Sequence, residues 1–203
     1  MSDFVAFAWL GVHHIVDTSA LDHILFLVAL AAIYRPRDWR DALRVVSAFT
    51  VGHSVSLALA VAGVVPFDAR AVEFLIPLTI VATSVGNVVA RDRAATPPGW
   101  RSRPLLAAVF GLVHGAGFAG YLQSLLLDHV AVPLLGFNVG IEIGQLCVLA
   151  VVAAALAAVD AVLRLVRTSA WSGAPSELRL RTVGLSVIVG VVAAAWAVER
   201  RPW

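Results

Sequence analysis

The stretch from Phe110 to Gln145 reads FGLVHGAGFAGYLQSLLLDHVAVPLLGFNVGIEIGQ and decides the fold. It contains two apolar helical runs joined by a short turn, and it places polar side chains inside them: His114, Asn138, Glu142 and Gln145. Ionisable groups at membrane depth are costly, so they usually mark a functional site. Both runs also repeat glycine at every fourth residue, a spacing that lets helix backbones pack closely in a membrane: Gly111 and Gly115, then Gly136, Gly140 and Gly144.

The composition of the whole chain indicates an integral membrane protein. Of its 203 residues, 60% are hydrophobic and only 14% are charged, whereas soluble domains average about 25% charged residues. The mean hydropathy is +0.89 and the isoelectric point is near 9.3. Because the basic residues are arginines placed in loops, this value predicts no nucleic-acid partner. The single cysteine, Cys147, excludes an internal disulfide and a cysteine-based metal site.

Turn and charge signals divide the chain into six apolar spans within one transmembrane domain, residues 1–203. The spans cover about residues 19–34, 41–64, 71–89, 104–127, 133–165 and 183–198. The apolar residues 4–16 are too few to cross a bilayer, which needs roughly 20, so they predict a short interfacial or re-entrant segment. We therefore expect an all-α integral membrane protein, a bundle of about six transmembrane helices.

The arginines predict the orientation of this bundle. They are concentrated in the loops after the first, third and fifth spans, whereas the intervening loops contain only Arg70. By the positive-inside rule, this alternation predicts that both termini lie outside. The terminal Arg200 and Arg201 run against the rule.

The predicted topology gathers polar side chains in the outer half of the bundle. Asn138, Glu142 and Gln145 share one helix face at spacing i, i+4, i+7, and Ser47, Thr50 and Ser54 share a face of the second span. The candidate metal ligands are His14, Asp22, His23, His53, His114 and Glu142. Ser54, Glu73, Asn138 and Gln145 are expected to orient those ligands. His13 and His129 are expected at the outer surface.

Imidazole and carboxylate ligands suit a divalent transition metal ion, here nickel, cobalt or zinc. The competing interpretation is that each polar side chain only forms a hydrogen bond across helices. That interpretation suits a lone asparagine or serine. The gathering of several histidines and carboxylates at one depth favours the metal site.

Four segments carry a family resemblance: GVHHIVDTSALDHILFL (11–27), AFTVGHSVSLALA (48–60), FGLVHGAGFAGYL (110–122) and FNVGIEIGQL (137–146). In this order they resemble the HupE/UreJ family of bacterial membrane proteins. The resemblance implies a nickel or cobalt permease of the bacterial inner membrane, linked to hydrogenase and urease maturation. It implies that Asp22 and His23 are a key metal-handling pair, with His53, His114 and Glu142 at further motif positions.

The chain departs from the family pattern at two places. Seven residues separate His14 from Asp22, where the family's first motif usually has five between a histidine and the Asp-His pair. Tyr121 stands where the hydrogenase-linked branch has a glutamate. The chain is therefore more similar to the broader branch of the family.

Three functions stay open on the sequence. The first is a permease that captures the ion outside and releases it inward, although Ser84, Asn87 and Asp160 are the only polar candidates for an inner step. The second is an intramembrane zinc hydrolase with three histidine ligands and Asp22 or Glu142 as general base. A serine hydrolase using Ser54 lacks the G-x-S-x-G elbow.

The third function is an accessory or metal-sensing subunit. In that case the glycine-lined face of residues 133–165 would bind a membrane partner or a second copy of the chain. The expected partners are thus the lipid bilayer, a metal ion and a homo-oligomer or membrane partner, with no nucleic acid.

Overall fold

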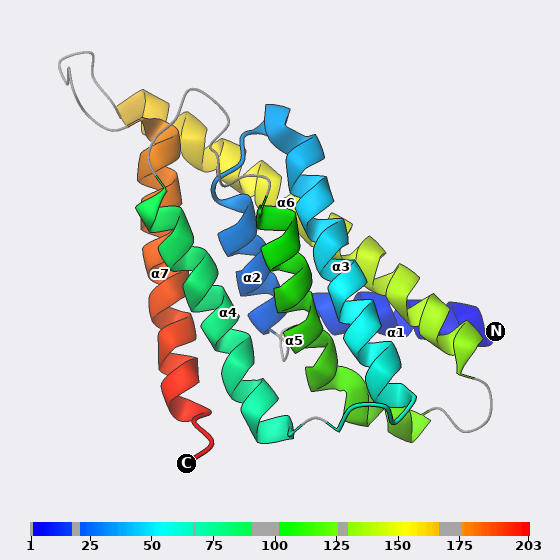
Figure 1. Ribbon diagram of the computed structural model, residues 1–203. Helices are drawn as coiled ribbons and strands as arrows, with labels where there is room; N and C mark the ends of the chain where they lie inside the picture. Colours follow the sequence, from blue (N-terminus) through cyan, green and yellow to red (C-terminus); the bar gives the residue numbers. More distant parts are fainter. Residues whose placement is uncertain (1, 18–20, 67, 91–101, 126–129, 167–175) are drawn as a thin grey trace.

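The computed structural model describes residues 2–17, 21–66, 68–90, 102–125, 130–166 and 176–203. Within these ranges every regular element is a helix and there is no strand, which confirms the all-α prediction (Figure 1). The elements are α1 (Asp3–Val16), α2 (Leu21–Ala31), the 3-10 helix η2 (Pro36–Asp38), α3 (Trp39–Val61), α4 (Ala69–Val89), α5 (Arg103–Leu125), α6 (Ala131–Val166) and α7 (Glu177–Glu199). His129 lies outside the described residues.

The chain is a multi-pass integral membrane protein. The helices α3 to α7 are each long and apolar enough to cross a membrane, giving five candidate spans. The shorter helices α1 and α2 meet at a bend of 68° and together make a sixth, broken span or a re-entrant loop. Figure 1 shows α1 lying crosswise to α2. This arrangement confirms a bundle of about six helices with a short N-terminal segment.

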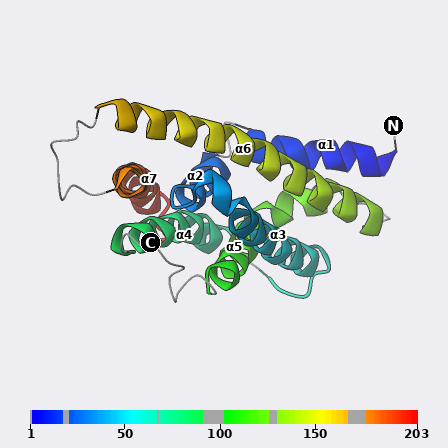
Figure 2. The same ribbon diagram turned by 90° about the horizontal axis from the view of Figure 1, so that it is seen from above.

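Glycines hold α1 and α6 together as a parallel pair, which lies along one edge of the bundle (Figure 2). Gly136, Gly140 and Gly144 of α6 follow the backbone of α1 in register, next to Phe4, Ala8 and Val12. A Cβ atom at Gly140 would overlap the carbonyl oxygen of Ala8, so only glycine permits this approach. The face that was left open for a partner or a second copy is therefore covered by α1 of the same chain.

A second glycine-mediated pair is formed by α3 and α5, which also run parallel. Gly52 of α3 lies against the backbone of Ala108, while Gly111 and Gly115 of α5 lie against the carbonyls of Phe49 and His53. These glycines are likewise taken up by contacts within the chain. The close approach fixes the position of His53 relative to α5.

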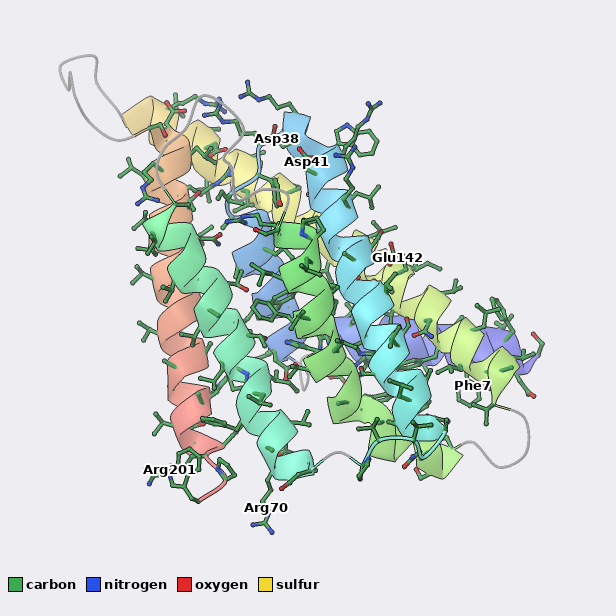
Figure 3. All side chains as sticks on the ribbon, viewed as in Figure 1. Phe7, Asp38, Asp41, Arg70, Glu142 and Arg201 are labelled. Carbon is green, nitrogen blue, oxygen red and sulfur yellow. The ribbon has the colours of Figure 1, made fainter. Side chains whose placement is uncertain are left out.

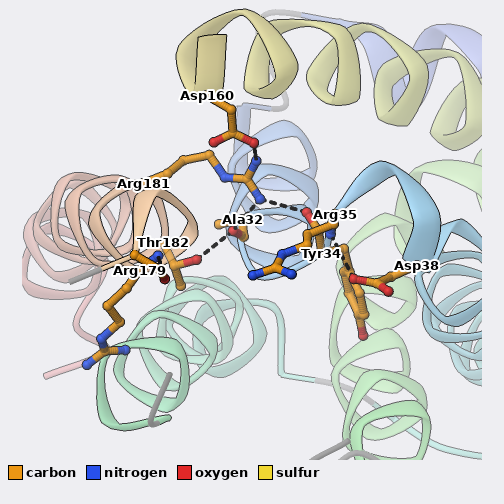
Figure 4. Close-up of polar contacts among 9 residues, drawn as sticks. Ala32, Tyr34, Arg35, Asp38, Asp160, Arg179, Arg181 and Thr182 are labelled. Atoms are coloured by element: carbon orange, nitrogen blue, oxygen red, sulfur yellow. Dashed lines mark hydrogen bonds and ion pairs between the residues drawn. The ribbon is translucent and has the colours of Figure 1, made fainter. Parts of the chain in front are cut away.

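The helices α4 and α7 are antiparallel and contact the C-terminal end of α2 at the arginine-rich end of the bundle. The last carbonyls of α2 have no partner within the helix. Arg181 of α7 donates to the carbonyl oxygens of Ala32 (3.2 Å) and Tyr34 (2.6 Å), and the Thr182 hydroxyl donates to that of Ala32 (2.8 Å), as Figure 4 shows. Arg181 is only 3% exposed and forms an ion pair with Asp160 of α6, which offsets the high cost of a buried charge.

Asn87 completes this capping from α4. Its side-chain amide donates to the carbonyl of Ala29 (2.6 Å) and to the hydroxyl of Ser186 (3.2 Å), and its oxygen accepts from Arg103 (3.1 Å). Of the polar candidates for an inner step, Asn87 and Asp160 are therefore already engaged in structural contacts. Figure 3 shows Asp38 and Asp41 at this same end, with Arg70 and Arg201 at the opposite end.

Candidate metal site

Three histidines from three different helices converge in the bundle. His14 of α1, His23 of α2 and His53 of α3 each offer a ring nitrogen, and these atoms all lie within 4.8 Å of one another. The ring centroids are 4.7 Å apart for His14 and His23, 6.0 Å for His14 and His53, and 6.1 Å for His23 and His53. His23 and His53 are buried and His14 is half-buried. We call these three residues the histidine triad.

Each histidine of the triad has at least one buried ring nitrogen without a hydrogen-bond partner among the described residues. Nε2 of His14, Nε2 of His23 and both ring nitrogens of His53 are buried and unpartnered. A buried polar atom without a partner costs about 1–3 kcal/mol. Three imidazole nitrogens within 4.8 Å of one another form a ligand set that suits a transition metal ion.

Asp22 sets the tautomer of His23. It lies in the first turn of α2, where the helix dipole favours a carboxylate. Its Oδ1 lies 3.1 Å from Nδ1 of His23 and accepts from the His23 backbone N–H at 3.0 Å. An ionised carboxylate only accepts, so Nδ1 carries the proton and Nε2 keeps the lone pair that a metal needs. The other oxygen, Oδ2, lies 3.6 Å from Arg200 at the end of α7.

His114 lies next to the triad without belonging to it. Its ring centroid is 5.2 Å from that of His23, and its Nε2 lies 2.9 Å from the Thr79 hydroxyl of α4. That hydroxyl donates its only proton to the carbonyl of Ile76 (2.7 Å), so Nε2 of His114 must be the donor to Thr79. The lone pair is therefore on Nδ1, which is buried and unpartnered.

Glu142 and Gln145 connect α6 to α3 and lie outside the triad. The Ser47 hydroxyl donates to Oε1 of Glu142 at 2.7 Å, and the Thr50 hydroxyl donates to Oε1 of Gln145 at 2.7 Å. Figure 3 shows Glu142 on α6 beside α3. The two polar faces expected from the sequence thus meet each other, and the structure gives Glu142 a helix-helix contact.

The other residues expected to orient ligands are more scattered. The Ser54 hydroxyl donates to the carbonyl of Thr50 at 2.7 Å. Asn138 is half-buried, with an unpartnered side-chain oxygen. Glu73 is exposed in α4 and forms no hydrogen bond or ion pair with a described residue. His13, the neighbour of His14, is exposed and packs edge-on against Trp9 with 4.7 Å between ring centroids.

Aromatic side chains surround the histidines. Phe118 contacts His14 with 4.0 Å between centroids and stacks on Phe137 at 5.0 Å. Phe26 and Phe49 lie 5.3 and 5.1 Å from His114. This apolar wall excludes water and lowers the local dielectric constant, which strengthens electrostatic interactions at the site.

Sequence reasoning missed Thr79 and Arg200 as parts of the site. Thr79 follows Pro77 in an otherwise apolar part of α4, a local irregularity that could have drawn attention to it. Arg200 had a clearer signal, because an arginine at the end that is predicted to lie outside contradicts the positive-inside rule. Its ion pair with Asp22 supplies a physical reason for that exception.

A comparison with models of known protein families identifies the family of this chain. The family model described as HupE / UreJ protein matches residues 1–200, and the chain belongs to this family. The resemblance carried by the four sequence motifs is thereby confirmed. Neither the curated proteins nor the solved structures contain a match.

Proposed function

We propose that this member of the HupE/UreJ family is a membrane permease for a divalent transition metal ion, nickel or cobalt, and that the histidine triad binds the ion. The observation that supports the proposal is the convergence of three ring nitrogens within 4.8 Å from α1, α2 and α3. The resemblance to this family implies nickel or cobalt as the transported ion. A carboxylate behind one ligand and an apolar wall around all three are features of metal sites in general.

The chemistry of the triad suits an ion that must leave again. Three neutral imidazoles bind nickel, cobalt or zinc, but they supply no charge to neutralise a divalent ion. The one adjacent carboxylate, Asp22, is shared with Arg200, and Cys147 is exposed on α6 and offers no thiolate to the site. Transport requires binding that is weak enough to permit release, and this ligand set meets that requirement.

In this proposal His114 is the next ligand along the path. Its Nδ1 is unpartnered, and its ring packs edge-on against that of His23 with 5.2 Å between centroids. An ion could therefore exchange from the triad to His114 without leaving imidazole coordination. Thr79 contributes by holding His114 in the tautomer that keeps Nδ1 available.

We further propose that the arginine-rich end faces the cytoplasm and that both termini lie outside, in a bacterial inner membrane. The described arginines support this orientation, because most of them lie at one end of the helices: Arg35, Arg37, Arg40, Arg44, Arg103, Arg164, Arg179 and Arg181. The triad and Asp22 lie toward the other end, near Arg200. The ion would then bind from outside.

The proposal is tested by measuring binding and flux on the same variants. Wild-type protein is expected to bind one nickel ion per chain in calorimetry and to load nickel into proteoliposomes. His14→Ala removes one ligand from the triad and should weaken binding by at least about tenfold, as loss of a ligand contact costs at least about 1.4 kcal/mol. His13→Ala is the matched control, because His13 is its exposed neighbour on α1.

Two outcomes would refute the permease. If wild-type protein contained no metal and bound none measurably, the proposed metal site would be refuted. Tight binding without flux, in protein that elutes as a single species, would reject transport and favour a catalytic site.

A second function, an intramembrane zinc hydrolase, is favoured by one observation. Three histidines with a carboxylate behind one of them are also the ligand arrangement of catalytic zinc sites, which keep a fourth position for water. Neither candidate for the general base of a hydrolase is free of other contacts. Asp22 contacts His23 and Arg200, and Glu142 accepts a hydrogen bond from Ser47. Ser54 is a poor nucleophile, since its hydroxyl is donated to a backbone carbonyl.

A further inference from the structure

Two adjoining cavities lie at the arginine-rich end, away from the metal site. The first, which we call the α6 groove, has a volume of about 450 Å³ and lies between α6 and the region joining α2 to α3; its apolar lining includes Leu43, Leu146, Leu149 and Ala153. The second, which we call the arginine pocket, has a volume of about 650 Å³. Arg35, Pro36 and Ala157 line both cavities, so the two are continuous. Both volumes are in the range of ligand sites, about 300–1,000 Å³.

The arginine pocket has an excess of positive charge. Arg35, Arg37 and Arg164 line it, together with the carboxylates of Asp160 and Glu177. Asp160 is neutralised by its ion pair with Arg181, and Arg37 lies 3.7 Å from Asp38. Arg35 and Arg164 form no ion pair with a described residue, so their guanidinium groups are available to an anion.

The lining changes in a regular order along α6. Leu146, Leu149 and Ala153 face the groove, Ala157 lies at the junction, and Arg164 lines the pocket. Tyr34 and Trp39, near Arg35 and Pro36 in the sequence, line the groove from the α2–α3 region, and Trp39 is 57% exposed. Tyrosine and tryptophan mark the head-group level of a membrane. The order is therefore apolar, then aromatic, then cationic, as along a phospholipid from its acyl chains to its phosphate.

We propose that this composite cavity binds one anionic phospholipid, with an acyl chain in the α6 groove and the phosphate between Arg35 and Arg164. Basic pockets between transmembrane helices recognise anionic head groups in this way. The bound lipid would fill the space between α6 and the α2–α3 region, where the buried Asp160–Arg181 pair connects α6 to α7. The proposal is independent of metal transport, because the two sites share no residue.

The experiment compares two lipids on the delipidated full-length protein by native mass spectrometry. Phosphatidylglycerol and phosphatidylcholine with identical acyl chains are added in competition, and wild-type protein is expected to retain phosphatidylglycerol. One arginine near a lipid phosphate changes affinity by about fivefold, so Arg35→Gln/Arg164→Gln should lower phosphatidylglycerol affinity by about 25-fold. The control Arg40→Gln/Arg44→Gln removes the same charge from exposed residues at the same end, outside both cavities, and should keep the preference.

A third variant and a soluble anion separate the two parts of the site. Ala153→Phe fills the α6 groove and should weaken both lipids while leaving the preference between them. Equal retention of both lipids by the wild type, or the same loss in the control double variant, would overturn the proposal. Displacement of phosphatidylglycerol by millimolar inorganic phosphate, with no effect of Ala153→Phe, would show a site for soluble anions and would overturn it too. Single-species elution of each variant shows that the fold is kept.

Discussion

Replacing Arg200 by glutamine is expected to tighten metal binding at the histidine triad. The Arg200 guanidinium lies 3.6 Å from Oδ2 of Asp22, whose Oδ1 lies 3.1 Å from Nδ1 of His23. An ion bound to the far side of that imidazole is then at most roughly 13 Å from the guanidinium along these contacts, given a metal–nitrogen bond of about 2 Å. Both groups are cations, so Arg200 opposes the ion.

The magnitude follows from Coulomb's law. Even at roughly 13 Å, a divalent and a univalent cation repel each other as strongly as two unit charges at about 6.5 Å, which is about 0.6 kcal/mol in water and about 2.5 kcal/mol at an effective dielectric constant of 20. The Arg200 side chain is 34% exposed, so screening by solvent favours the low end of this range. About 1.4 kcal/mol corresponds to a tenfold lower Kd. The Asp22 carboxylate, no longer shared, also makes His23 a more basic ligand, which acts in the same direction.

The assay is isothermal titration calorimetry with nickel on purified protein at fixed pH and salt. Arg201→Gln removes the same charge from the next residue, and its Kd should change by less than about twofold. Arg200→Lys keeps the charge and should resemble the wild type. If Arg200→Gln binds nickel no more tightly than the wild type, or if Arg201→Gln shows the same gain, the electrostatic role of Arg200 is wrong.

Three further predictions address the surrounding helices. Thr79→Val removes the acceptor that orients His114 of α5. Nickel uptake by proteoliposomes should therefore fall by about tenfold, while the nickel Kd of the triad should change by less than about threefold. The control Thr83→Val, one turn further along α4, should leave uptake and Kd unchanged. Gly140→Leu forces a side chain into the backbone of α1 and should cost at least about 3 kcal/mol in overpacking, read as loss of thermal stability, whereas Gly184→Leu, where a Cβ meets no atom within 4 Å, should be neutral. Glu142→Gln should keep nickel Kd within about threefold, and a tenfold weakening would instead make Glu142 a ligand.

Hydropathy and charge were enough to predict an all-helical bundle of about six apolar segments. A helix in a membrane satisfies its own backbone, so apolar length alone identifies spans. His14, His23 and His53 were also among the predicted ligands. His14 was included despite its unusual spacing from Asp22, and in the structure that spacing accompanies the bend of 68° between α1 and α2.

The sequence could not show which polar faces meet. The face of Ser47 and Thr50 and the face of Glu142 and Gln145 were both predicted, but their pairing depends on how α3 lies against α6. The same limitation applies to the glycines of α6. A small-residue face predicts close contact with some helix, and it does not say whether that helix belongs to the same chain.

The packing divides the bundle into three bodies, and the triad takes one histidine from each. His14 belongs to the glycine-locked pair α1–α6 and His53 to the pair α3–α5. His23 belongs to α2, whose C-terminal end is held to α4 and α7 by Asn87 and Arg181. Backbone contacts within the glycine-locked pairs leave little freedom. Between bodies, the contacts include single polar bonds such as that of Thr79 with His114.

A bound ion would therefore join all three bodies at one point, and a small shift of one body would remove a ligand. The proposed permease would need such a step, because Phe26 and Phe49, which contact His114, offer no ligand for the ion. Within the described residues, the polar groups beyond them are mostly engaged in capping α2. In the proposed permease, release toward that end would require movement between the bodies, and three neutral imidazoles would bind the ion weakly enough for such movement to free it.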